Sequence, residues 1–312
     1  MSSRKTAGPR RSVSCPPVLV TRQVASALLR LYDYPHPHKS GRTIRGYDKP
    51  HSLRGYDKPH SLRTAQMCAA VALHLGYPNE KVRQYQIACL LHDLGRVGLD
   101  QALFGEIWSW AQKNGIPTRP AEWRVVHPTT SYGKETEAFL EKYRSALEQH
   151  GIRMDPWACE QVEMRLGFAR RLKRRLREIK PELRHLRITW SPWMEKVMLY
   201  YYYPEKLVSA PHWVRELGEI LVACEQLEAY NNRRRGQDYY TRSRESFAEA
   251  FGYLDSLKRK GMLSEKVVQA VRSLTAEGLF DSILMSARGG MVSSTELEYL
   301  RKLSPGVVSC PS

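Results

Sequence analysis

The clearest hydrophobic pattern in the chain is the apolar run from Ile87 to Leu91, which His92 and Asp93 interrupt just before Gly95. Such a run is typical of a buried helix that ends at the glycine. A buried imidazole and carboxylate need partners, because an unpaired buried charge is very costly. A divalent metal ion suits both side chains. The alternative is an ordinary helix C-terminus, where His92 would face the negative end of the helix dipole.

Helical spacing continues on both sides of this run. Residues 61–75 carry an apolar stripe at i, i+3, i+4 and i+7, and residues 79–93 follow as the next helix. In the helix expected at 212–232, Glu225 lies on an otherwise apolar face. Further helices are predicted at 104–113, at 135–149, at 155–187 as one longer helix, and at 245–275 as two helices. The fold class is therefore predicted to be all-α.

A nonapeptide, RGYDKPHSL, occurs twice in tandem, at 45–53 and again at 54–62. Two copies are too few for a repeat architecture. Only the second copy leads directly into the 61–75 helix, so His60 is the histidine expected at the start of that helix. A shifted register that uses His51 is the alternative.

Positive charge is concentrated between 165 and 187, where ten basic residues stand against two acidic ones. The whole chain has a net charge of +17 at pH 7, which favours an anionic partner such as a nucleotide, nucleic acid or acidic protein. The segment is either a solvated helix face or an arm that binds nucleic acid or an acidic protein. It lacks an aromatic ladder, so it offers no stacking platform for single strands.

The cysteines and the apolar runs indicate a cytoplasmic protein. The six cysteines are scattered without a C-x-x-C pair, and Cys68, Cys89 and Cys224 fall in apolar helical patterns typical of reduced core residues. No apolar run is long enough to span a membrane, and the Arg-rich start lacks the apolar stretch of an export signal. We therefore expect no membrane association.

The order of His60, the LLHDLGRVG segment with His92-Asp93, and His127-Pro128 resembles the HD superfamily of metal-dependent phosphohydrolases. Within it the chain is most similar to the HD-GYP branch, whose closing I-L-x-x-A-D-x-x-D-A-L helix is similar to residues 219–230. The resemblance covers roughly residues 56–133 and 195–275. It implies an HD-domain helical bundle, here with an inserted basic helical arm.

The resemblance also implies a metal site with open positions for water and phosphate. Its ligands would be His60, His92, Asp93 and Glu225, with His127 holding a second ion, and the metal would be Fe, Mn or Zn. Asp93 and Arg96 would be the catalytic residues, Arg96 standing where the family has Lys. Arg233, Arg234 and Arg235, together with Arg96, would contact substrate phosphates.

Two departures from the branch stand out. Glu225 replaces the family's Asp. The chain keeps Tyr203-Pro204 but lacks the preceding His pair. The positions of this pair fall on Tyr201-Tyr202 or on Met194-Glu195, depending on where a gap is placed when the chain is aligned with the branch. A buried aromatic cluster is the expected role of these tyrosines.

We expect five segments: a basic tail and linker (1–44), the first part of the HD core (45–133), a basic helical insertion (134–193), the second part of the core (194–288) and a C-terminal tail (289–312). Three functions compete. One is a phosphohydrolase for a nucleotide, cyclic di-GMP being what the branch resemblance implies. Another is a degenerate HD protein that binds a nucleotide or protein partner in signalling, and the third is a nucleic-acid-binding adaptor.

Overall fold

The computed structural model describes residues 19–35, 43–44, 58–231, 246–290 and 292–303. Across these residues the fold is all-α, as predicted, apart from a ladder of two short antiparallel strands, β1 (Tyr34–Pro35) and β2 (Thr43–Ile44). The helices are α1 (Arg22–Arg30), α2 (Lys58–His74), α3 (Asn79–Leu90), η1 (Leu94–Arg96), α4 (Gln101–Lys113), α5 (Pro120–Val126), α6 (Glu135–Gln149), α7 (Pro156–Leu166), α8 (Phe168–Glu178), α9 (Lys180–His185), α10 (Pro192–Leu199), η2 (Pro204–Leu207), α11 (His212–Asn231), α13 (Phe247–Arg259), α14 (Glu265–Ala276), α15 (Asp281–Ala287) and α16 (Ser294–Arg301).

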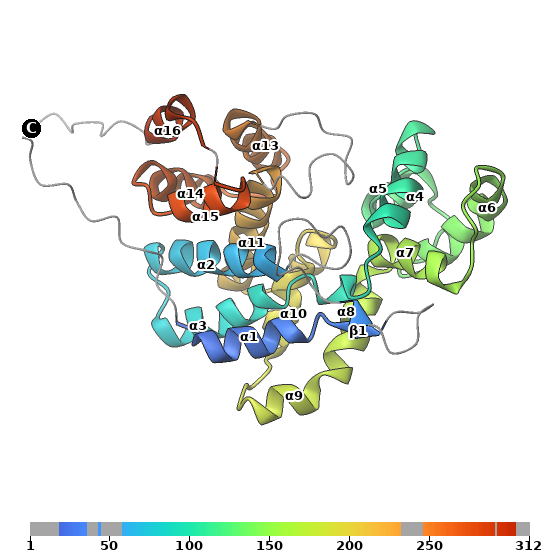
Figure 1. The fold of residues 1–312 in the computed structure, drawn as a ribbon, viewed down its shortest axis with the longest axis horizontal. Coiled ribbons are helices and arrows are strands. Elements are labelled where there is room, and N and C mark those ends of the chain that lie inside the picture. The colour runs from blue at the N-terminus through green and yellow to red at the C-terminus, as the bar shows by residue number, and fades with distance from the viewer. Residues whose placement is uncertain (1–18, 36–42, 45–57, 232–245, 291, 304–312) are drawn as a thin grey trace, which may run out of the picture.

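The main core forms around α11, which packs against α2, α10, α13, α14 and α15 (Figure 1). Every residue from Glu216 to Glu228 is buried, because neighbouring helices cover α11 on all sides. α3 packs on α2 and on α10. Cys68, Cys89 and Cys224 lie in this core as buried free thiols, as their apolar surroundings predicted.

A second, smaller core lies between α4, α5, α6 and α7, to the right of the main bundle in Figure 1. Trp108, Trp123 and Phe139 form its aromatic centre, with ring centroids 5.3 Å apart for Trp108 and Phe139. Its buried residues run from Leu99 to Leu166. Buried residues between Leu99 and Trp123 therefore pack with α6 and α7 of the segment 134–193.

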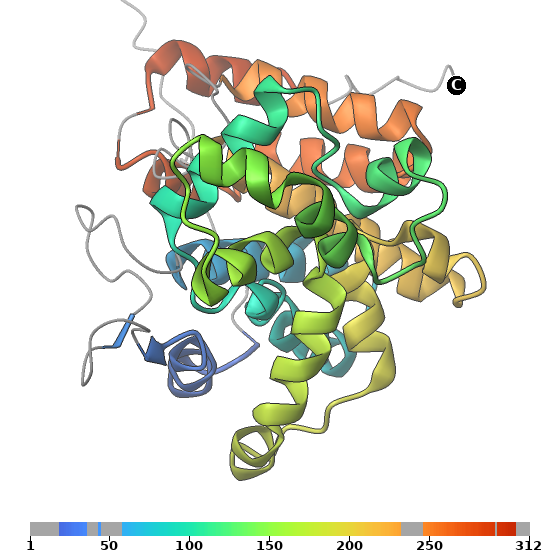
Figure 2. The ribbon, with the colours of Figure 1, turned by 90° about the vertical axis from the view of Figure 1, so that its right-hand side faces the viewer.

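The basic segment 155–187 is three helices, so the prediction of one long helix was wrong. α7 ends at Gly167, where a Cβ atom would lie 2.6 Å from the side chain of Glu163. α9 starts with Pro181 in its first turn, a position that tolerates proline. Between them, α8 leaves the small core and runs along the main bundle toward α9 (Figures 1 and 2), burying Phe168, Leu172 and Leu176 in the main core.

The C-terminal part also contains more structure than the expected tail. α16 begins at a capping box in which Ser293 and Glu296 bond to each other's backbone N–H groups. Leu300 of this helix is buried in the main core. Among the described residues no helix combines the length and apolar character needed to cross a membrane.

Candidate metal centre

Three helices of the main core bring four polar side chains to one buried point. His60 lies in the first turn of α2, and His92 and Asp93 follow the end of α3. Glu225 comes from the middle of α11. One ligand atom from each of the four lies within 4.8 Å of the others, and all four residues are buried. The structure therefore brings together four of the five metal ligands predicted from the sequence.

Hydrogen bonds fix the orientation of both imidazole rings. Nδ1 of His92 donates to the backbone carbonyl of Cys89 at 2.7 Å, and Nδ1 of His60 donates to the carboxylate of Glu228. Each ring therefore presents Nε2 to the centre, at 4.0 Å from Asp93 Oδ2 for His60 and 3.8 Å for His92. This tautomer, with Nδ1 protonated, leaves the Nε2 lone pair available for a metal.

The donor set fits a divalent cation. Asp93 and Glu225 bring two carboxylates into one buried space, where a bound cation would offset their mutual repulsion. Nε2 of His92 is buried, and no described residue hydrogen-bonds to it. Two nitrogen and two oxygen donors are the ligand types that Zn, Mn and Fe accept. The four residues together could hold one such ion.

Glu228 is a residue of the centre that the sequence did not single out. It is fully buried, and besides His60 it accepts a hydrogen bond from Nε of Arg63 at 2.7 Å. It stands one helical turn after Glu225, so both carboxylates lie on the same face of α11. That spacing was the available signal. Glu228 orients His60, and Arg63 balances its buried charge.

Arg96 lies at the edge of the centre. Its Nε is 3.4 Å from Oδ1 of Asp93, and its guanidinium donates to the hydroxyl of Tyr202. The ring of Tyr202 in turn stacks on Phe168 of α8, with centroids 4.5 Å apart. Arg96 is thus held close to the predicted ligands by side chains from α8 and from the loop after α10.

The positions where the HD-GYP branch has its His pair have other roles here. The Tyr201 hydroxyl accepts a hydrogen bond from Arg119 at 2.7 Å and lies 3.0 Å from the Tyr253 hydroxyl. In the other alignment the pair falls on Met194 and Glu195. Met194 is buried in the main core, and Glu195 pairs with Lys173 at 3.7 Å. Tyr201 and Tyr202 therefore belong to a partly buried cluster of aromatic and arginine side chains, whereas the sequence predicted a buried aromatic cluster.

His127 lies at the end of α5, with its ring centroid 4.1 Å from that of Trp123 in the small core. Burial, and to a smaller degree Lys142, lower the pKa of His127, which favours the neutral ring. Within the described part of the chain, the metal-binding group does not include His127. His51 and the three predicted phosphate ligands Arg233, Arg234 and Arg235 lie outside the described residues.

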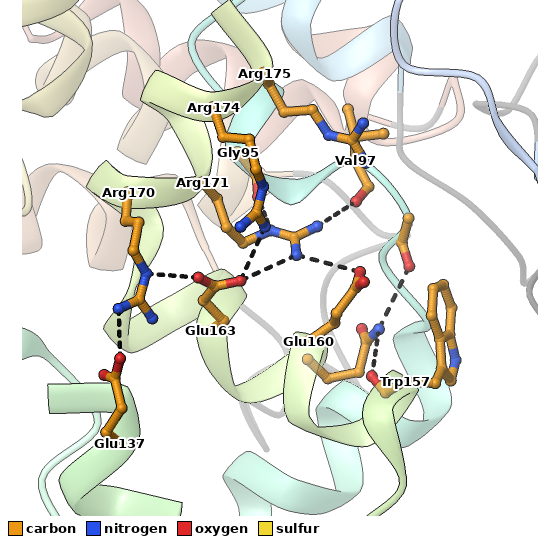
Figure 3. Close-up of polar contacts among 12 residues, drawn as sticks. Gly95, Val97, Glu137, Trp157, Glu160, Glu163, Arg170, Arg171, Arg174 and Arg175 are labelled. Atoms are coloured by element: carbon orange, nitrogen blue, oxygen red, sulfur yellow. Dashed lines mark hydrogen bonds and ion pairs between the residues drawn. The ribbon is translucent and has the colours of Figure 1, made fainter. Parts of the chain in front are cut away.

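Several arginines of the basic segment are bound within the protein (Figure 3). Arg170 and Arg174 pair with Glu163. Arg175 pairs with Glu178, which the figure does not draw. Arg165 donates to the backbone carbonyl of Thr118. The exposed basic residues that remain candidates for an anionic partner include Arg177, Lys180, Arg184 and Arg187.

Comparison with known proteins gives one match. No curated protein and no solved structure matches the chain. A match to a family covers part of the main core and of the small core, including three of the four clustered residues. Residues 59–119, which include His60, His92 and Asp93, match the HD domain family.

Proposed function

We propose that the protein is a metal-dependent phosphohydrolase that cleaves a phosphate ester of a nucleotide. The observation that carries the proposal is the convergence of His60, His92, Asp93 and Glu225 at one buried point. The HD domain match over residues 59–119 supports it, because that superfamily contains metal-dependent phosphohydrolases. The four-residue group has the size of a site for one ion.

Each side chain of the site has its own proposed role. A bound divalent ion would polarise the phosphoryl oxygen and lower the pKa of a bound water. His60 and His92 supply neutral nitrogens, while Asp93 and Glu225 supply the negative charge that retains a cation. Arg96 presents a fixed positive charge to the phosphate oxygens, and Tyr202 positions its guanidinium. Arginine stays protonated, so Arg96 stabilises charge and does not donate a proton to the leaving group.

Charge favours a nucleotide substrate. The net charge of +17 raises the local concentration of anions around the protein. Cyclic di-GMP is the phosphodiester to test first, because of the resemblance to the HD-GYP branch, and a nucleoside phosphomonoester is the other class. Arg233, Arg234 and Arg235 remain the proposed phosphate ligands outside Arg96.

A second candidate function is binding of a nucleotide or protein partner without turnover. The observation that favours it is the use of Tyr201 and Tyr202 to hold Arg119 and Arg96. In the branch that the sequence resembles, a His pair stands near this position and ligates metal. A centre without that pair would retain an ion and an anionic ligand but lack part of the catalytic machinery.

The first experiment measures metal content by elemental mass spectrometry on protein purified without chelator. The wild type is compared with a His92→Ala, Asp93→Ala double variant and with His74→Ala, which removes an exposed histidine of the same helix as His60. We expect about one equivalent of Fe, Mn or Zn in the wild type and in His74→Ala, and none in the double variant. Absence of metal from well-folded wild-type protein would contradict the proposal that the protein is a metal-dependent phosphohydrolase.

Hydrolysis then separates the two candidates. Bis(p-nitrophenyl) phosphate, cyclic di-GMP and a nucleoside monophosphate are offered with and without chelator. Turnover that disappears with chelator and in the double variant supports the phosphohydrolase. Stoichiometric metal together with nucleotide binding and no turnover favours the binding protein instead.

A further inference from the structure

One arginine of the inserted segment reaches the loop of the metal centre. Arg171, on α8, is 1% exposed. Its Nε donates to the backbone carbonyl of Gly95 and its Nη2 to that of Val97, each at 2.8 Å (Figure 3). These two carbonyls flank Arg96 and follow Asp93 in the chain. Arg171 is thus hydrogen-bonded to the backbone on both sides of a residue that faces the centre.

The same guanidinium is held from its other side by α7. Its Nη1 lies 3.2 Å from Oε2 of Glu160 and 3.5 Å from Oε2 of Glu163 (Figure 3). A buried guanidinium is tolerated when carboxylates and hydrogen-bond acceptors compensate its lost hydration. Two carboxylates of the insertion therefore orient the group that holds the loop. We call this set of contacts the Arg171 bridge.

The loop has little freedom to move independently of α8. A Cβ atom on Gly95 would lie 2.7 Å from the ring of Phe168, so α8 approaches the loop as closely as a glycine allows. The turn of η1 starts at Asp93, whose carbonyl accepts from the N–H of Arg96 at 2.7 Å. A shift of Gly95 or Val97 would therefore be transmitted through one turn of backbone to Asp93 and Arg96.

We infer that Arg171 is a positioning residue of the metal centre, and that the insertion sets the metal affinity through it. The inference rests on the proposed function, since it requires that the centre binds a metal. It also gives a role to one residue of the basic segment, because the charge of Arg171 acts inside the protein, on the backbone of Gly95 and Val97. By linkage, metal binding must stabilise the bridge by as much as the bridge strengthens metal binding.

If Arg171 has only a structural role, the expected results are different. If Arg171 only ties α8 to the core, its removal lowers thermal stability but leaves the metal affinity of the folded protein unchanged. If it positions Asp93, the folded variant binds metal more weakly, with altered coordination. Loss of a group that orients metal ligands typically costs about 10–100-fold in affinity.

The test is a titration of metal-free protein with Co²⁺, followed by visible absorption, at a temperature where all variants are folded. Arg171→Ala is compared with Arg171→Lys and with Arg170→Ala, which removes the neighbouring arginine that pairs with Glu163 and Glu137. We expect about 10–100-fold weaker binding and a changed spectrum for Arg171→Ala, partial recovery for Arg171→Lys, and wild-type binding for Arg170→Ala. Wild-type affinity and spectrum in folded Arg171→Ala would overturn the inference.

Amide hydrogen exchange on the metal-free proteins separates this inference from the proposed function. We expect faster exchange at residues 94–98 in Arg171→Ala than in Arg170→Ala. If wild type binds no Co²⁺, the proposed function fails together with the metal part of the inference, whereas faster exchange at 94–98 still supports the bridge. Equal exchange in both variants overturns the bridge itself.

If Arg171→Ala does not fold, a Glu160→Gln, Glu163→Gln double variant replaces it, because it retains the arginine but removes the carboxylates that orient it. Weaker Co²⁺ binding in the double variant supports the inference. Unchanged binding opposes it.

Discussion

His60 and Glu228 stand 168 positions apart in the chain and form a buried hydrogen bond between α2 and α11. The bond joins His60 to the helix that carries Glu225, another of the four candidate ligands. It also fixes the His60 ring with Nε2 toward Asp93. The four residues therefore come together only when α2 and α11 pack together, so the proposed metal binding would be linked to folding of the main core.

This bond predicts the effect of Glu228→Gln. The amide oxygen can still accept from His60, but the loss of negative charge lowers the basicity of the imidazole and weakens the pair with Arg63. We expect metal affinity to fall by about 10–100-fold, measured by Co²⁺ titration. Glu219→Gln is the matched control, since Glu219 is a buried glutamate of α11 that accepts from the backbone N–H of Ser264. Equal effects of the two substitutions would contradict a role for Glu228 in the centre.

Gly95→Ala is expected to destabilise the fold. Its Cβ would lie 2.7 Å from the Phe168 ring, which is stacked on Tyr202 and cannot move away freely. Overpacking of this kind costs about 1–3 kcal/mol in the free energy of unfolding, measured by urea denaturation. The control is Gly252→Ala in α13, where a Cβ would meet no atom within 4 Å. There the better helix propensity of alanine should raise stability by about 0.5–1 kcal/mol. Unchanged stability of Gly95→Ala would mean that α8 does not constrain Gly95.

The periodicity of the sequence predicted the helical fold, and the resemblance to the HD superfamily predicted the four clustered residues. His92, Asp93 and Glu225 also stand out in the sequence because they interrupt apolar helical patterns. A polar residue at such a position has to find a partner, and His60, His92, Asp93 and Glu225 are one another's neighbours. Glu228 lies one helical turn after Glu225, but that spacing alone does not identify its partners. Its partners come from α2, and that contact depends on how the two helices pack.

The basic segment was harder to interpret for a related reason. The sequence does not show which of the ten basic side chains in this segment are buried, because their burial depends on tertiary contacts. Arg171 is enclosed because α8 packs on η1, whereas Arg177, two turns later, is exposed. The break between α7 and α8 lies at Gly167, where a Cβ atom would lie 2.6 Å from the side chain of Glu163. Periodicity alone does not reveal either feature.

Glu163 gives a prediction about pH. Burial favours its neutral form, but hydrogen bonds from Arg170 and Arg174 outweigh burial and hold its pKa below the ordinary value of 4.5. A carboxylate with a lowered folded-state pKa contributes stability above the unfolded-state value, and this contribution is lost as the pH falls through the folded-state pKa. The stability gap between wild type and Glu163→Gln should therefore be largest above pH 4.5 and shrink below it.

Urea unfolding from about pH 6 down to about pH 3 measures this gap. Glu141→Gln, which removes an exposed carboxylate from α6, controls for the loss of one negative charge. A gap for Glu163→Gln that stays constant over the whole range would contradict the proposed ion pairing with Arg170 and Arg174.

The last prediction concerns Glu225, which stands where the HD-GYP branch that the sequence resembles has aspartate. α11 is covered on all sides, so its backbone cannot move to compensate for a shorter side chain. We expect Glu225→Asp to withdraw the carboxylate from His60, His92 and Asp93 and to weaken metal binding. Glu225→Gln keeps the length but removes the charge, and it should weaken binding as well. Co²⁺ affinity and phosphodiester hydrolysis are measured for both. If Glu225→Asp instead binds metal more tightly and gains hydrolysis, the glutamate limits catalysis in this chain, and binding without turnover becomes the better description of its function.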